Sequence, residues 1–335
     1  MRRAKMKLAS LLLPLFLVSS ALVVVTPGYS FLPELTIPAG GGTPAANHWS
    51  MSSFQVQWNI NPSIGSNVTG TTSVTTVISN SFNTWITAPN TSVNVIAGAT
   101  SSITQENNSP PNINLICFVC SDVKFGGTET LGITLSTSVN GAGLPDGHGG
   151  TTQFAGQIIH ADIAFNPAVT FDTGGGTGQD LRTVATHEIG HFLGLDHSAI
   201  AHAVMFPQAA SVLTTLSFDD VAGISSLYPK TPADVGTGSI SGTVTMTTGA
   251  PVFGAHVFAN STTGVDPFGA FPTIRPSPIG ALSDTAGNFT ISGVPADSYL
   301  VIAEPLDGPV VDSDIGWAAA FNQPSVQTNF TTRWH

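Results

Sequence analysis

Charged residues are scarce in this chain of 335 residues. Asp, Glu, Lys and Arg together make up 9% of it, and nine residues are Lys or Arg. So few cations exclude the basic surface that nucleic-acid binding requires, so no nucleic-acid partner is expected. The apolar fraction of 41% is ordinary for a globular protein, and the length suits about two domains.

Cysteine is nearly absent. The two cysteines, Cys117 and Cys120, stand in the order Cys-Phe-Val-Cys. In an exported chain this spacing favours a disulfide between them, with two free thiols as the second alternative. Metal binding ranks last, because a zinc site would need two more ligands and none is near in the sequence. A redox motif would normally open a helix, whereas the apolar run 113–119 is typical of a strand.

Long apolar runs are confined to the N-terminus. Basic residues precede an apolar run at 8–25, and the small residues Gly28 and Ser30 follow it. This pattern predicts a signal peptide at 1–30, cleaved near Ser30, and a secreted, extracellular protein without a later membrane span. The run is close to the ~20 residues that span a bilayer, so an uncleaved anchor is the alternative. Beyond the leader, five Lys and Arg remain beside twenty Asp and Glu, a net charge of −15.

The region after the leader predicts a mixed arrangement of helices and strands. Residues 31–49, rich in Pro, Gly and Ala, are expected to form a flexible lead-in. Alternating apolar residues from Phe54 to Ile60 predict a strand, and the apolar spacing over 74–86 predicts a helix that Pro89 ends. Further strands are expected at 93–97, 113–119, 131–136 and 158–165, and helices at 179–193 and 217–227.

The composition changes again near residue 230. Residues 230–238 have the Pro and Gly content of a linker. Short β-type runs at 240–246, 252–259, 288–292 and 299–303 then predict a small antiparallel β-sandwich at 239–330. The predicted fold class is therefore α+β over 50–229, with a mixed twisted sheet, followed by a small all-β domain.

One motif carries the chemistry. The segment from Thr186 contains H-E-x-x-H-x-x-G-x-x-H. His187 and His191 are four apart on the expected helix, so both imidazoles can reach one zinc ion. Gly194 falls where the chain must leave the helix in a left-handed conformation, which allows His197 to return as the third ligand.

Glu188 is the expected general base. Three imidazoles leave the fourth zinc position to a water molecule, whose proton Glu188 can accept. The pattern predicts one catalytic zinc ion and a hydrolase. A solvated helix face is the alternative for a bare H-E-x-x-H, but the register of Gly194 and His197 weighs against it.

These residues resemble the metzincin metalloproteases and, among them, the matrixins. Ser198 after the third histidine and the Met-turn-like Met205, within Ala-Val-Met-Phe-Pro, carry the resemblance over residues 50–229. It implies a metzincin-type fold and endopeptidase activity on proteins or peptides that lie extended along an edge strand. It also implies that 204–207 line the pocket for the side chain after the cleaved bond. Hydrolysis of a non-peptide amide is compatible with the same motif.

The resemblance is incomplete at the metal sites that matrixins hold outside the catalytic centre. Phe154 and Ala164 stand where matrixins place two histidines of a structural zinc site, so that site is expected to be absent. His148 and His160 lie nearby and are expected to be polar surface residues.

Calcium is a second candidate ion. The resemblance places Asp146, in a Gly-rich turn, and Asp162 with Asn166 at positions where matrixins bind Ca²⁺. Aspartate and glycine clusters are also common in ordinary turns, which is the alternative for these residues.

The C-terminal region resembles carboxypeptidase regulatory-like β-sandwich modules, chiefly through the run at 287–295. The resemblance implies attachment to a surface or matrix, and a plain spacer is the alternative. A surface binding or adhesion protein with a vestigial metzincin domain is the rival to the protease. The presence of Glu188 with all three histidines argues against such decay.

Overall fold

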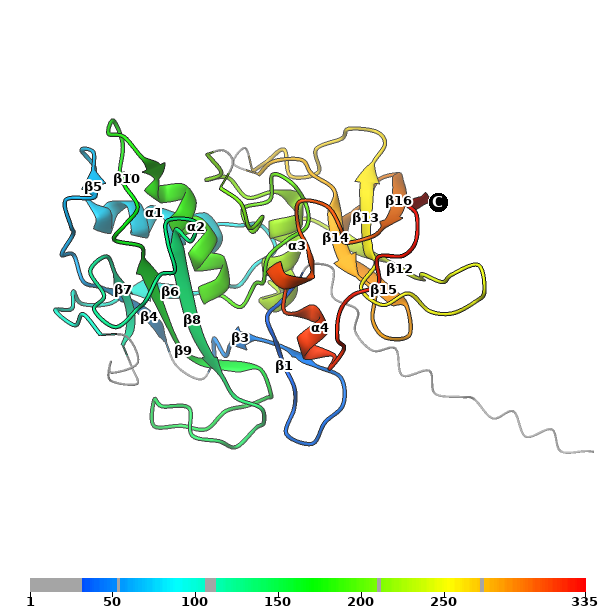
Figure 1. Cartoon of the computed structure of the whole chain (residues 1–335), viewed down its shortest axis with the longest axis horizontal. Helices are drawn as coiled ribbons and strands as arrows, with labels where there is room; N and C mark the ends of the chain where they lie inside the picture. The colour runs from blue at the N-terminus through cyan, green and yellow to red at the C-terminus, as the bar shows by residue number, and fades with distance from the viewer. Residues whose placement is uncertain (1–31, 53–54, 106–112, 210–211, 272–273) are drawn as a thin grey trace, which may run out of the picture.

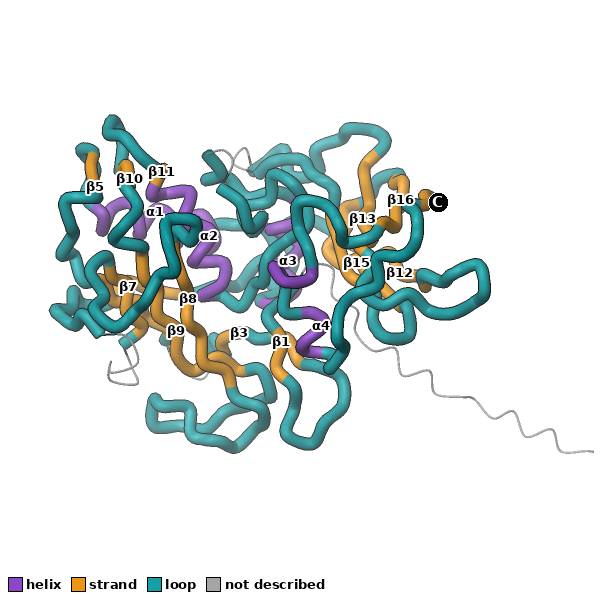
Figure 2. The backbone as a smooth tube through the Cα atoms, viewed as in Figure 1, coloured by secondary structure: helices purple, strands orange, loops and turns teal. Residues whose placement is uncertain are grey.

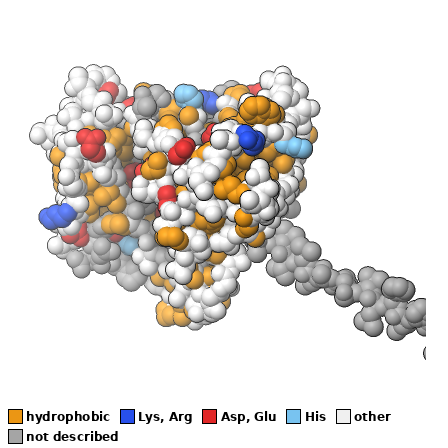
Figure 3. Space-filling view, turned by 45° about the vertical axis from the view of Figure 1, so that its right-hand side comes forward, with side chains coloured by type: hydrophobic (Ala, Val, Ile, Leu, Met, Phe, Trp, Pro, Cys, Tyr) orange, Lys and Arg blue, Asp and Glu red, His pale blue; other side chains and the backbone are white. Residues whose placement is uncertain are grey.

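The computed structural model describes residues 32–52, 55–105, 113–209, 212–271 and 274–335. The described chain forms two parts that lie side by side, with the main sheet, α1 and α2 in one and a β-rich C-terminal part in the other (Figures 1 and 2). The α+β fold class with a C-terminal β part is confirmed. Most of the face shown in Figure 3 is neutral, with few charged side chains, as the composition requires.

The main sheet has six strands in the order β3-β9-β7-β4-β6, with β8 also paired to β9. Its pairs are parallel except for β8, which runs antiparallel to β9. Among the described strands β8 pairs with β9 alone, so one edge of β8 is left open. The strands are β3 (His48–Trp49), β4 (Val56–Ile60), β6 (Val95–Ala97), β7 (Asn114–Cys117), β8 (Gly132–Ser138) and β9 (Gln157–Phe165).

Helix α1 (Val74–Ile86) has the bounds that its apolar spacing predicts. Its N-cap Ser73 accepts a hydrogen bond from the Thr76 N–H, an interaction that contributes about 1 kcal/mol to helix stability. Its buried face consists of Val74, Val77, Ile78, Ser81, Phe82 and Trp85.

Helix α2 (Leu181–Phe192) carries the zinc motif and packs on α1. The N-cap carboxylate of Asp180 accepts the Thr183 N–H at 2.7 Å. The Trp85 indole N–H donates to the Thr186 carbonyl at 2.9 Å, so the two helices are joined by a buried hydrogen bond. A three-stranded parallel sheet leads into α2; it consists of β5 (Val68–Thr69), β10 (Phe171–Asp172) and β11 (Gln179–Asp180).

The C-terminal part packs directly against the last helix of the first part, α3 (Phe218–Leu227). A Cβ atom added at Gly293 would lie 3.0 Å from Ala222 of α3, so backbone and helix are in close contact there. The part has a two-stranded and a four-stranded sheet, built from β12 (Thr237–Thr243) with β15 (Asn288–Pro295), and from β14 (Ile279–Leu282), β13 (His256–Ser261), β16 (Tyr299–Glu304) and β17 (Arg333–Trp334).

Residues 32–49 differ from the flexible lead-in predicted for 31–49. Leu32 and Trp49 are buried, and β3 is a strand of the main sheet. A hairpin of β1 (Leu35–Thr36) and β2 (Ala45–Ala46) lies between them. The average composition of this stretch hides two large apolar anchors, and these anchors hold it against the rest of the protein.

The predicted signal peptide at 1–30 lies outside the described residues, as does Phe54. No helix in the described ranges has the length and apolar content needed to cross a membrane.

The sulfur atoms of Cys117 and Cys120 lie in contact, and their Cα atoms are 5.7 Å apart, a separation that suits a disulfide. Their redox state stays a prediction.

Candidate metal and active site

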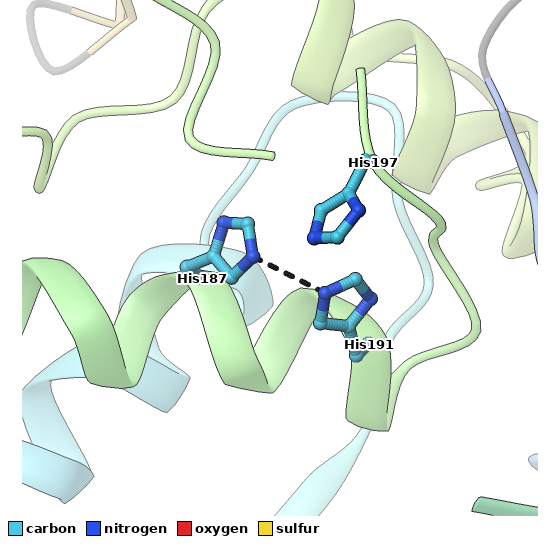
Figure 4. Close-up of side chains that lie close together, drawn as sticks. All are labelled: His187, His191 and His197. Carbon is cyan, nitrogen blue, oxygen red and sulfur yellow. Dashed lines mark hydrogen bonds between the residues drawn. The ribbon is translucent and has the colours of Figure 1, made fainter. Parts of the chain in front are cut away.

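The structure brings His187, His191 and His197 together. The first two project from α2 and the third from the segment that follows it, and the three rings face one another (Figure 4). One ligand atom from each ring lies within 4.8 Å of the others. Among the residues that the structure describes, this is the one group of three or more His, Cys, Asp or Glu side chains arranged in this way.

Each imidazole is bonded to a backbone carbonyl through Nδ1. The Nδ1 atom of His187 lies 2.8 Å from the Val204 oxygen, and that of His191 lies 2.7 Å from the Leu195 oxygen. A carbonyl can only accept, so Nδ1 carries the proton and the Nε2 lone pair points inward. The Nε2 atoms of His187 and His191 are 3.2 Å apart. This donor set fits a zinc ion, which takes neutral imidazole nitrogen and commonly has a carbonyl behind each ring.

Burial keeps two of these imidazoles neutral. The pKa of His187 is lowered to about 4, chiefly by burial and also by the nearby His197, while the hydrogen bond to Val204 opposes the fall. Burial lowers the pKa of His191 well below its usual value, with the neighbouring histidines acting in the same direction. Both rings therefore offer a free lone pair at neutral pH.

The chain leaves α2 through a Schellman turn at Gly194, which has φ +96°. The Leu195 N–H donates to the Gly190 carbonyl at 3.0 Å, and the Gly194 N–H donates to His191 at 2.8 Å. A Cβ atom at 194 would overlap the Asn47 carbonyl. The left-handed conformation predicted for Gly194 is confirmed, and the turn also places the Leu195 oxygen against His191.

Glu188 is buried beside the histidines. Burial raises the pKa of its carboxyl to about 7, against a hydrogen bond from the Thr134 hydroxyl. Thr134 belongs to strand β8, and its hydroxyl lies 2.7 Å from Oε2 of Glu188. A Cβ atom at Gly132 would come within 3 Å of the same carboxylate, so a side chain there would crowd it. A carboxyl with a pKa near neutrality can accept and release a proton.

An open cleft of about 990 Å³ passes over this group. The residues of β8 from Gly132 to Thr134 form part of its lining, together with Val204, Phe206 and Pro207. Met205 itself is buried, and its side chain lies directly against Gly190 of α2. An extended peptide could therefore lie along β8 with one side chain near 204–207.

Asp220 holds the backbone around Met205. Its carboxylate accepts the Val204 N–H at 2.8 Å and the Met205 N–H at 3.2 Å, and it also completes a capping box with Ser217. Asp220 therefore joins the start of α3 to the loop whose Val204 carbonyl accepts from His187.

The neighbouring Asp219 joins the two parts of the protein. Its carboxylate accepts the Ser198 hydroxyl at 2.6 Å and the Gly280 N–H of β14 at 2.8 Å. Burial raises its pKa from 3.8 to about 7, the hydrogen bonds from Gly280 and Ser198 oppose the rise, and Asp220 adds to it.

This pKa shift predicts a pH dependence of stability. Between pH 3.8 and about 7 the folded chain keeps a proton on Asp219 that the unfolded chain has lost, so stability falls as the pH rises through this window. Each pH unit corresponds to about 1.4 kcal/mol. Asp219→Asn keeps an acceptor for Gly280 and does not titrate, so the decline in Tm from pH 4 to 7 should become shallower. The exposed Asp122→Asn is the control, and parallel curves for Asp219→Asn and the wild type would contradict the assignment.

The candidate calcium residues are engaged with the protein itself. Asp146 accepts the backbone N–H groups of His148 and Gly150 within its turn. Asp162 accepts the Leu115 N–H and lies 3.0 Å from His160 Nε2. Calcium binding stays a prediction.

The third candidate, Asn166, is held in the same way. Its amide donates to the carbonyls of Gly127 and Thr130, both at 2.7 Å, while its oxygen accepts the Ala168 N–H. These bonds give Asn166 a role in ordering the loop before β8.

Comparison with known protein families agrees with this geometry. Residues 127–229 match the matrixin family model, and residues 239–310 match the carboxypeptidase regulatory-like domain. The chain thus carries a matrixin-like metzincin segment followed by a carboxypeptidase regulatory-like module.

Individual relatives match parts of the chain. The hatching enzyme of Paracentrotus lividus is 39% identical over 104 residues, metalloendoproteinase 1-MMP of Arabidopsis thaliana 40% over 114, and matrilysin of Rattus norvegicus 36% over 111. These alignments cover 30%, 31% and 31% of this chain, and 16%, 31% and 42% of the respective relatives. The chain therefore matches less than half the length of each.

Proposed function

We propose that this protein is a secreted zinc-dependent endopeptidase. The observation that carries the proposal is the convergence of His187, His191 and His197 beside the buried Glu188 in an open cleft. The matrixin match at 127–229 spans this site, and the relatives of the chain include a matrilysin and a metalloendoproteinase, which supports peptide bonds as the target. We assign residues 50–229 to the protease unit, 230–238 to a linker and 239–330 to the β-module. Strand β3 at His48–Trp49 extends the sheet of the protease unit just before these bounds, and β12 begins at Thr237, within the last residues of the linker.

The proposed reaction uses Glu188 as a proton carrier. A zinc ion, when bound by the three imidazoles, would supply the positive charge that polarises a peptide carbonyl and makes a water molecule more acidic. Glu188 would accept a proton from the attacking water and deliver it to the leaving amine nitrogen. The hydrogen bond from Thr134 orients the carboxylate for both transfers.

The open edge of β8 is the proposed substrate site. A peptide that adds to this edge would form backbone hydrogen bonds with little regard to its sequence. We propose that the side chain after the cleaved bond enters the cleft between 204 and 207, with Met205 buried beneath the zinc ligands.

Metal removal tests the proposal. The purified chain should hold one zinc ion and cut a mixed-sequence peptide library, and a zinc chelator should abolish cleavage, which added zinc restores. His187→Ala should lose the metal and the activity, whereas His335→Ala, an exposed histidine far along the chain, should retain both. Cleavage that persists both after chelation and in His187→Ala would contradict the proposed zinc-dependent activity.

A further inference from the structure

A segment near the C-terminus reaches the third histidine. Residues 309–317, here named the strap, contain the short 3₁₀ turn η1 (Asp312–Asp314) and lead into α4 (Trp317–Ala320). The strap is the orange-red segment before α4 in Figure 1. The family matches end at residues 229 and 310, so residues 311–317 lie beyond both.

Three polar contacts join the strap to the cleft and to residues 194–198, here named the zinc loop. His197 Nδ1 lies 2.5 Å from the Asp314 carbonyl oxygen, 117 positions further along the chain. The Gly316 N–H donates to Asp196 Oδ2 at 2.8 Å, and Asp196 Oδ1 accepts the His197 N–H at 2.7 Å. The Gln208 amide donates to the Pro309 carbonyl at 2.9 Å.

His197 depends on such support more than the other two histidines do. His187 and His191 stand on α2, and their carbonyl partners belong to the zinc loop and the Met-turn. His197 follows the turn at Gly194 and has no helix to fix its ring. The Asp314 carbonyl fixes the proton on Nδ1 and leaves Nε2 free for a metal.

The strap is itself anchored, so it can hold another group in place. Its apolar side chains Val310, Ile315 and Trp317 are buried in a cluster with Leu32 and Leu306. The Trp317 indole N–H also donates to the Ser283 carbonyl at 3.2 Å. The C-terminal part therefore presents the Asp314 carbonyl from a packed element.

We propose that the strap is a positioning element for the third zinc ligand: it holds His197 in the tautomer and orientation that bind the metal, so the C-terminal part is needed for full zinc affinity. This inference rests on the proposed zinc site. It gives the C-terminal part a role in the catalytic centre beyond spacing or attachment.

A matched pair of substitutions at Gly316 tests it in the full chain. Gly316 has φ −75° and ψ 7°, and Ile315 before it is extended at φ −133° and ψ 138°, so proline fits the backbone. Gly316→Pro removes the N–H that Asp196 accepts and places the ring against that carboxylate. Gly316→Ala keeps the N–H, and its Cβ would lie 3.4 Å from Asp196 Oδ2, an ordinary contact.

The readout is the zinc dissociation constant, measured by competition with a chromophoric chelator, together with kcat, KM and thermal unfolding. Gly316→Pro should raise the constant about 10- to 100-fold, the range for loss of a group behind a metal ligand, and should lower kcat more than it changes KM. The zinc dissociation constant of Gly316→Ala should stay within about threefold of the wild-type value, because this variant keeps the N–H that Asp196 accepts. Equal zinc affinity in the two variants would overturn the inference while leaving the proposed function intact.

A measurement on the wild type covers the case in which Gly316→Pro does not fold. In the zinc-loaded protein, ¹H–¹⁵N correlation of the histidine rings should show His197 with a slowly exchanging Nδ1 proton. A rapidly exchanging Nδ1 proton, or zinc bound through Nδ1, would overturn the inference. A wild-type chain that binds no zinc at the three histidines would overturn the proposed function itself.

Discussion

Glu188→Gln is expected to lower kcat/KM for a peptide substrate by about a hundredfold or more, the scale of a lost general base. Glutamine has nearly the same shape as glutamate and can still accept the Thr134 hydroxyl, but it cannot take a proton from water. Zinc content and Tm should therefore change little. The measurement is steady-state cleavage of a fluorogenic peptide identified from the library, with zinc content determined on the same samples.

Glu129→Gln is the matched control for this substitution. Glu129 also lines the cleft, but its side chain is exposed and its position is outside the zinc motif. The same chemical change there should leave kcat/KM within about threefold, because no proton transfer is assigned to it. Similar losses in both variants would indicate a general charge effect, and full activity in Glu188→Gln would remove Glu188 from the mechanism.

Regular elements of this fold could be predicted from the sequence where a repeating pattern specified them. The apolar spacing of α1 is a local pattern, as is the alternation of Ile159, Ala161, Ile163 and Phe165 in β9, and the observed bounds follow these patterns closely. The short strand β14 was not predicted, because Ile-Gly-Ala-Leu has neither length nor alternation. It pairs with β13, and that pairing depends on contacts distant in sequence.

The candidate site likewise has residues that could be predicted from the sequence and contacts that could not. Spacing identified the three histidines and Glu188 as a group, because helix periodicity places His187 and His191 on one face and the glycine at 194 allows the chain to return with His197. The carbonyls of Val204, Leu195 and Asp314 could not be predicted, because a backbone oxygen has no signature in the sequence. The hydrogen bonds that Asp219 and Asp220 accept behind the site had one signal in the sequence, the two adjacent aspartates, because carboxylates that become buried require partners.

The zinc loop is held from two directions. The Leu32 carbonyl accepts the Asp196 N–H at 2.6 Å, and the Glu34 N–H donates to the Gly194 carbonyl at 2.9 Å. The strap contacts Asp196 and His197 from the C-terminal part. Segments from both ends of the described chain thus meet on a loop of a few residues, so the position of the third histidine depends on tertiary packing.

Gly194→Ala should be the most destabilising single substitution at this loop, at about 2–4 kcal/mol. Alanine at φ +96° costs about 1 kcal/mol by itself, because its Cβ crowds the backbone in the left-handed region. The added Cβ would also overlap the Asn47 carbonyl, so the turn or the segment before β3 must shift. Such a shift would move the Leu195 oxygen from His191 and weaken zinc binding. Urea denaturation and zinc competition measure the two effects.

Gly143→Ala separates the two causes. Gly143 has φ +76°, and an added Cβ would meet nothing within 4 Å, so this substitution carries the backbone cost alone. It should lower the free energy of unfolding by about 1 kcal/mol and leave zinc affinity unchanged. If Gly194→Ala lowers the free energy of unfolding by no more than Gly143→Ala does, the close approach of the Asn47 carbonyl does not constrain the turn.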